Sequence, residues 1–195
     1  MNCWILNGEI MKKQPQRTTK TRSTIINTFL ELSNQKPIDK ITVSEISSIA
    51  NLNRSTFYQY FNDINHILEY IEDDLIFYIK DNVVNQIGKI RTEQLFIELF
   101  IKINIEKRNI LKLLLSNQGF SIKLKEILIP LFANQMNLSL EDPQTIYKLD
   151  FYLSGIISIL SRWVTSNNPM PPEEYALLMK QIVEGMRKSE LFPNL

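Results

Sequence analysis

The sequence predicts an all-α fold in which an N-terminal three-helix head is joined by a long helix to a C-terminal helical domain. Apolar residues recur at spacings of three and four along most of the chain, which indicates amphipathic helices. No stretch alternates apolar and polar residues as a half-buried strand does. Hydrophobic residues make up 44% and charged residues 22% of the 195 residues, so a sizeable core is possible.

The first 19 residues are expected to form a flexible tail. Their apolar run is too short for a signal peptide, and no positive charge precedes it. Basic residues follow Met11, so either Met1 or Met11 fits as the start of translation. A first helix is predicted from Lys20 to about Asn34, with an apolar face that packs on the next two helices. Pro37 closes it.

Residues 41–61 predict two short helices joined by a tight turn. Apolar residues at helical spacing place the first helix at Val43 to Ala50. Thr42 and Glu45 have the T-x-x-E spacing of a capping box, in which each side chain accepts a hydrogen bond from the other residue's amide. Asn51 then ends the helix, because asparagine tolerates the left-handed conformation better than most residues.

The second of these helices is predicted from Arg54 to Phe61, with Asn53 as its N-cap and Phe57 facing the core. Eight residues span about 12 Å, comparable with a major groove about 12 Å wide. The outward side chains are hydroxyls, an amide and a guanidinium, which can donate to phosphates and base edges and carry no negative charge. The pattern is typical of a helix-turn-helix, and its predicted outer face comprises Arg54, Ser55, Tyr58 and Gln59.

The segment from about Lys20 to Leu68 resembles the DNA-binding domain of the TetR family of bacterial transcriptional regulators. The family signature T-[LF]-Y-x-[HY]-F is matched by TFYQYF at residues 56–61, and the match covers roughly a quarter of the chain. Two positions depart from it: Asn51 stands where many members have glycine, and Ile64 where members often carry a phosphate-binding lysine. Together with the outer face, the resemblance implies contacts with double-stranded DNA from Thr42, Arg54, Ser55, Thr56, Tyr58, Gln59, Tyr60 and His66.

Charge is distributed as this interpretation requires. Residues 1–62 contain eight Lys or Arg against four acidic residues, while the remainder contains 14 against 17. A basic front and a mildly acidic back are expected if only the front meets DNA.

The remaining chain is expected to be helical throughout. A connecting helix runs from Ile64 to about Gln86, a break follows at Gly88–Arg91, and the domains are placed at residues 20–66 and 67–195. Five later helices are predicted: Leu95–Ile103, Ile110–Leu114, Ile122–Met136 with Pro130 inside, one from Pro143 onwards, and Glu173–Arg187. A loop is predicted at Gln118–Phe120, and a break at residues 167–172 precedes the last helix.

The resemblance implies a homodimer whose last two helices from each subunit form a four-helix bundle. A two-fold dimer would present two recognition helices to successive major grooves. Small and apolar residues on the last two helices fit such an interface, although packing within one subunit would use the same residue types. The interface candidates are Ser154, Ile157, Ser158, Leu160, Val164, Leu178, Ile182 and Met186.

The resemblance also implies a small-molecule effector bound among the middle helices, which shifts the spacing of the two heads. Aromatic residues at helical spacing are the candidates for its pocket, and ordinary core packing is their alternative. They are Phe96, Phe100, Phe120, Tyr147, Phe151 and Tyr152.

An enzyme is the alternative that the residue inventory disfavours. One cysteine, Cys3, and one histidine offer no nucleophile pair and no metal site, and the sequence contains no G-x-S-x-G, H-E-x-x-H or glycine-rich phosphate loop. We therefore expect no cofactor, no metal and no membrane span. The expected function is that of a cytoplasmic transcriptional repressor, which its effector releases from a palindromic operator. A helical adaptor that binds proteins and has weak or no DNA binding is the other interpretation, supported by Ile64.

Overall fold

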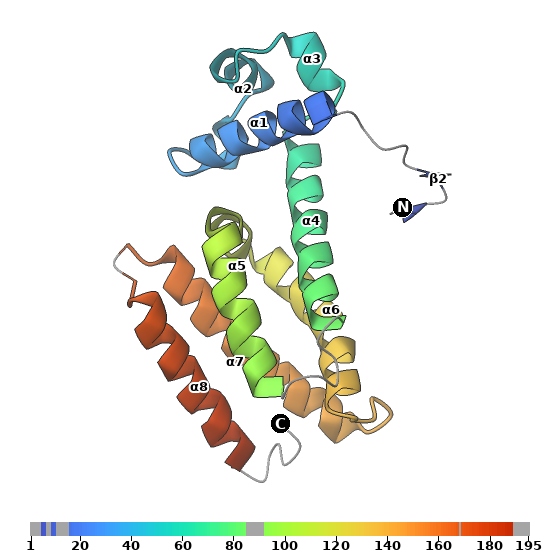
Figure 1. The fold of residues 1–195 in the computed structure, drawn as a ribbon, viewed down its shortest axis with the longest axis vertical. Coiled ribbons are helices and arrows are strands. Elements are labelled where there is room, and N and C mark those ends of the chain that lie inside the picture. The colour runs from blue at the N-terminus through green and yellow to red at the C-terminus, as the bar shows by residue number, and fades with distance from the viewer. Residues whose placement is uncertain (1–4, 7–8, 11–15, 85–91, 168, 189–195) are drawn as a thin grey trace. The chain divides into compact units, whose positions relative to one another are not determined.

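The computed structural model describes residues 5–6, 9–10, 16–84, 92–167 and 169–188 (Figure 1). Within these ranges the regular secondary structure is helical apart from two strands of two residues each. It divides into two compact units, residues 1–70 and residues 71–195. No helix in the described ranges is long and apolar enough to cross a membrane.

The N-terminal unit begins with a minimal antiparallel strand pair, β1 (Ile5–Leu6) and β2 (Glu9–Ile10). Two residues are too few to produce a recognisable alternation, so the sequence did not predict them. Helix α1 (Gln16–Ser33) starts four residues before its predicted start, which places residues 16–19 in a helix and not in the tail.

Three short elements follow: the 3-10 helix η1 (Ile38–Lys40), α2 (Val43–Ile49) and α3 (Arg54–Tyr58). Apolar side chains from α1, α2, α3 and the start of α4 meet in one core. Its fully or almost fully buried members are Ile25, Phe29, Ile46, Phe57, Phe61 and Ile67.

Helix α4 (Ile64–Val84) belongs to both units, because the boundary between them falls after Tyr70. It begins as predicted, with the Asp63 carboxylate accepting a hydrogen bond from the His66 amide at 2.8 Å. The structure describes it as far as Val84, so its predicted end at Gln86 lies outside the described residues. The predicted break at residues 88–91 lies outside the described residues.

The C-terminal unit consists of the end of α4 and four further helices, α5 (Thr92–Leu115), α6 (Gln118–Gln135), α7 (Pro143–Thr165) and α8 (Pro172–Lys188). Helix α5 packs against α6, α7 and α8, and α6 packs against α7, as Figure 1 shows. The last two helices begin within one residue of the predicted positions, because Pro143 and Pro172 each stand first in a helix, where proline is tolerated.

Two predictions for the C-terminal unit differ from the structure. The two helices predicted between residues 95 and 114 form one helical run interrupted at Lys107, whose φ of −132° and ψ of 20° are not helical. The predicted loop at Gln118–Phe120 is wrong, because these residues form the first turn of α6. The Asn117 side chain caps that turn by accepting a hydrogen bond from the Gly119 amide at 2.9 Å.

Polar contacts fasten the second half of α4 to α5 and α6. The Lys107 ammonium lies 2.9 Å from the Asp74 carboxylate, and the Tyr78 hydroxyl donates to Glu106 at 2.6 Å. Lys123 of α6 lies 3.0 Å from Glu72. Lys107, the non-helical residue of α5, and the adjacent Glu106 therefore both contact α4.

Candidate nucleic-acid interface

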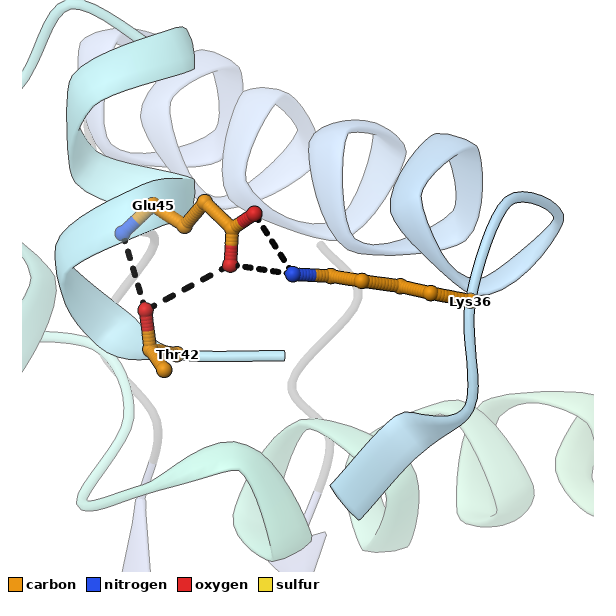
Figure 2. A network of polar contacts seen from close by, with 3 residues as sticks. All are labelled: Lys36, Thr42 and Glu45. Carbon is orange, nitrogen blue, oxygen red and sulfur yellow. Dashed lines mark hydrogen bonds and ion pairs between the residues drawn. The ribbon is translucent and has the colours of Figure 1, made fainter. Parts of the chain in front are cut away.

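The start of α2 is held from two directions (Figure 2). The Thr42 hydroxyl accepts a hydrogen bond from the Glu45 amide at 3.3 Å, as predicted. The Glu45 carboxylate, predicted to bond back to the Thr42 amide, is instead held by the Lys36 ammonium at 2.5 and 2.6 Å. Lys36 lies in the loop after α1, so this contact ties α1 to α2. The hydrogen bond and charge of Lys36 lower the pKa of Glu45.

The turn between α2 and α3 is a Schellman motif built on Asn51. Its φ of 53° is in the left-handed region, as predicted. The Leu52 amide donates to the Ser47 carbonyl at 2.8 Å and the Asn51 amide donates to the Ser48 carbonyl at 3.2 Å. The last carbonyls of α2 are thereby satisfied, and the chain reverses within a few residues.

Helix α3 is shorter than predicted and is capped differently. It ends at Tyr58, although the Phe61 amide still donates to the Phe57 carbonyl at 3.1 Å in the following turn. Asn53 occupies the N-cap position, but its side chain makes no capping bond, and its carbonyl accepts from the Thr56 and Phe57 amides. The helix is thus held mainly by packing.

That packing comes from alternate burial of neighbouring side chains. Phe57 is fully buried and its ring lies 6.1 Å from that of Phe61, whereas the adjacent Tyr58 is 56% exposed. The Phe57 and Tyr58 rings meet edge to face with their centroids 5.6 Å apart. The buried phenylalanines anchor α3 and direct Tyr58 outward.

The eight residues predicted to contact DNA fall into two groups. Thr42, Arg54, Ser55, Tyr58 and Gln59 are exposed, and Thr56, Tyr60 and His66 are half-buried. The structure thus brings most of the outer face of α3 to the surface. No acidic residue occurs between residues 53 and 60.

Several of these side chains have partners that the sequence did not indicate. The Arg54 guanidinium donates to the hydroxyl of Ser44 on α2. The Arg22 guanidinium of α1 lies over the rings of Tyr60, at 5.9 Å, and Tyr70, at 5.3 Å. These contacts join residues from different helices, so no local sequence pattern could have found them.

His66 has a defined structural role at the start of α4. Its Nδ1 accepts a hydrogen bond from the Asn62 amide at 3.1 Å, and its ring lies 5.5 Å from that of Phe61. Nδ1 is therefore an acceptor, and in the neutral ring the proton is on Nε2. Ile64, at the position where the resemblance expects a lysine, is half-buried.

In the C-terminal unit, a cavity of about 80 Å³ lies among all five helices. The side chains that enclose it are almost all hydrocarbon. They are Ile79, Ile103, Leu111, Leu124, Leu128, Phe132, Ile156, Ile157, Leu160, Tyr175, Ala176, Met179 and Val183.

The predicted pocket residues whose side chains the structure describes do not line this cavity. Tyr147 and Phe151 lie on the exposed face of α7, at 77% and 66% exposure, whereas Phe120 and Tyr152 are buried elsewhere in the core. The side chains of Phe96 and Phe100 lie outside the described residues. The described wall of the cavity is mainly aliphatic, with Phe132 and Tyr175 as its aromatic members.

The predicted interface residues are also split by the structure. Ile157 and Val164 are buried within their own subunit, so they offer little surface to a second one. Ser158 is exposed, and the half-buried members are Ser154, Leu160, Leu178, Ile182 and Met186. The exposed stripe of α7 instead runs through Tyr147, Phe151, Gly155, Ser158 and Arg162.

Comparison with known proteins supports the family. Residues 90–185 match a TetR family model described as a transcriptional regulator C-terminal region. No curated protein matches the chain.

Solved structures share the fold across both units. A TetR transcriptional regulator from Streptococcus agalactiae 2603V is 22% identical, with 86% of this chain and 96% of that chain covered and a TM-score of 0.61. A TetR-family regulator described as putative, from Syntrophomonas wolfei, is 14% identical, with 88% and 97% covered and a TM-score of 0.68. The fatty acid degradation regulator FadR from Bacillus halodurans is 14% identical, with 88% and 96% covered and a TM-score of 0.64. The family match over residues 90–185 and the fold shared with these structures support a TetR-family transcriptional regulator.

Proposed function

We propose that the protein binds a palindromic DNA operator as a homodimer and represses transcription until a small-molecule effector releases it. The observation that carries the proposal is the outward face of α3, where Tyr58 is 56% exposed beside the fully buried Phe57. An anchored helix that presents hydroxyl, amide and guanidinium groups without a carboxylate is suited to a phosphate-lined groove.

The roles of the exposed groups follow from their chemistry. Tyr58, Ser55 and Thr42 have hydroxyls that donate to phosphate oxygens, and such contacts set the position of the protein on the duplex. Gln59 has an amide that can pair with an adenine edge in the major groove, where one good contact discriminates by about 1–3 kcal/mol. Arg54, held by Ser44, supplies a positive charge at the start of α3.

The exposed stripe of α7 supports a second copy of the chain as the partner. Tyr147 and Phe151 lie one turn apart and are largely exposed, an arrangement that a partner surface would cover. Gly155 of α7 and Gly185 of α8 are both exposed, and a methyl group added to either would meet nothing within 4 Å. Another helix could therefore approach closely at both positions. In this proposal Tyr147 and Phe151 belong to the dimer interface and not to the effector pocket.

Effector release is assigned to the apolar cavity of the C-terminal unit. Ile79 of α4 is part of its wall, and α4 continues into the head as one helix. An effector can shift DNA affinity only by its different affinity for the two conformations of the dimer. The cavity supports the proposal because α4 is among the helices that its occupant would touch.

Selection of bound fragments from a random DNA pool by the purified full-length protein tests the proposal. We expect enrichment of one short palindrome. Tyr58→Ala and Thr56→Ala should abolish this binding, and Gln59→Ala should relax the base preference, whereas Gln144→Ala, at an exposed glutamine of the C-terminal unit, should change neither. If nothing is enriched, the protein is better explained as a helical adaptor without DNA binding, and Ile64 becomes the residue of interest.

A further inference from the structure

The described wall of the cavity in the C-terminal unit is uncharged. Among the thirteen lining residues that the structure describes, none is acidic, basic or an amide. The hydroxyl of Tyr175 is the single oxygen-bearing side-chain group among them. Burial raises the pKa of Tyr175, so that hydroxyl stays protonated and neutral at physiological pH.

Such a wall discriminates strongly by charge. Moving an ionised carboxylate or ammonium into it is strongly unfavourable, because no opposite charge or set of hydrogen bonds in the described wall replaces its water. An apolar group that enters the same space gives up no hydrogen bonds to water, and its transfer out of water is favourable. Two basic residues of α5 are engaged elsewhere: the Arg108 guanidinium lies 4.5 Å from the centre of the Trp163 ring, and Lys107 is paired with Asp74.

The size of the cavity limits what it can hold without rearrangement. Its volume of about 80 Å³ is roughly half that of engineered apolar cavities, of about 150 Å³, that bind benzene or xenon. One small ring or a short alkyl group therefore approaches the limit, and a longer chain would have to separate the surrounding helices.

We propose that the effector of this protein is a small, uncharged and predominantly hydrocarbon molecule, or inserts such a group into the cavity. The inference rests on the proposed function and specifies the chemistry of its effector site. A free carboxylate, phosphate or ammonium on the inserted part is excluded by the wall.

The same geometry indicates how such a ligand acts. Ile103 and Leu111 of the wall lie four residues before and after the break in α5 at Lys107. Lys107 is held by Asp74 of α4, and Ile79 of α4 also faces the cavity. A ligand that pushes on Ile103 and Leu111 would bend α5 at its non-helical residue and would transmit the change to α4.

The test compares benzene with benzoate, which differ by one carboxylate, using the full-length protein. At about ten times its dissociation constant, benzene should raise the Tm by about 3–6 °C, and benzoate at equal concentration should leave it unchanged. Ala176→Leu, which fills the cavity, should remove the benzene effect. Leu177→Met, at the exposed neighbouring position of α8, should retain it.

A second measurement keeps the test independent of whether Ala176→Leu folds. The 129Xe chemical shift of dissolved xenon should change in a saturable manner with the wild-type protein. Three results would each overturn the inference. Benzoate could stabilise the protein as much as benzene does, benzene could affect both variants equally, or neither benzene nor xenon could bind. Operator binding measured without ligand separates this inference from the proposed function. If the protein does not bind an operator, the proposed function is contradicted, whereas the result for ligand binding in the cavity still stands.

Discussion

The ammonium of Lys36 lies 2.5 Å from one carboxylate oxygen of Glu45 and 2.6 Å from the other, and Glu45 stands nine residues further along the chain (Figure 2). The contact joins the loop after α1 to the first turn of α2. It also occupies the carboxylate that a reciprocal capping box would have used. The orientation of α2 relative to α1 therefore depends on an ion pair as well as on the buried core.

Replacing Lys36 by methionine should make the head less stable at pH 7. Lys36 lowers the pKa of Glu45 in the folded state, so its contribution is present above the ordinary Glu pKa of 4.5 and is lost as the pH falls through the folded-state value. The difference in unfolding free energy between wild type and Lys36→Met should therefore shrink towards zero in acid. Urea denaturation across the pH range measures it.

The exposed pair Lys40–Asp39, with 3.2 Å between its charged atoms, provides the matched control. Both of its side chains are more than two-thirds exposed, so Lys40→Met should have little effect at any pH. An equal effect of the two substitutions would show that the Lys36 contact has no special role.

Ser47→Ala should stabilise the protein. In the described part of the chain, the buried Oγ of Ser47 has no hydrogen-bond partner, so its hydroxyl loses water without compensation. Removing it should raise the free energy of unfolding by about 1 kcal/mol. Ser48→Ala, at the exposed neighbouring position of the same region, should be close to neutral. Chemical denaturation of both variants measures the two changes in stability. A loss of stability in Ser47→Ala would contradict the prediction and would show that the hydroxyl makes a hydrogen bond.

Phe57→Ala and Tyr58→Ala should separate folding from function. The fully buried Phe57 leaves a large cavity when truncated, so its loss should destabilise the head by about 3–5 kcal/mol. Tyr58→Ala removes an exposed side chain and should leave thermal unfolding nearly unchanged. A comparable loss of stability in both variants would mean that Tyr58 is part of the core.

Asn51 should tolerate glycine and resist alanine. Its φ of 53° is strained for a residue with a Cβ, and asparagine bears that strain better than alanine. Asn51→Ala should therefore lower the free energy of unfolding by about 1 kcal/mol, and Asn51→Gly should be neutral or slightly stabilising. Denaturation midpoints check this, and identical midpoints for the two variants would contradict the assigned conformation.

The elements that the sequence predicted well are those set by local chemistry. Thr42 sets a helix start by accepting a hydrogen bond from the Glu45 amide, Asn51 sets a helix end through its left-handed backbone, and Pro143 sets a helix start through its restricted φ. Each stands where it was predicted. The spacing of Phe57 and Phe61 likewise identified the buried side of α3.

Features that depend on packing between helices could not be read in this way. The partners of Lys36 and Arg22 come from other helices, and the aliphatic wall of the cavity is assembled from five helices. Ile157, an interface candidate with packing within one subunit as its alternative, is buried, because the packing of α5 and α6 on α7 decides which stripe of α7 faces outward. Aromatic residues such as Tyr147 look alike in sequence whether they line a pocket or face outward.

The most direct test of the central claim is a fluorescence anisotropy titration of the selected palindrome with wild type and Tyr58→Ala at several salt concentrations. If the outer face of α3 binds the groove, log K should fall linearly with log salt concentration, and Tyr58→Ala should weaken binding at least about tenfold without loss of folding. Binding by Tyr58→Ala that equals wild type, or an affinity that does not respond to salt, would contradict the account.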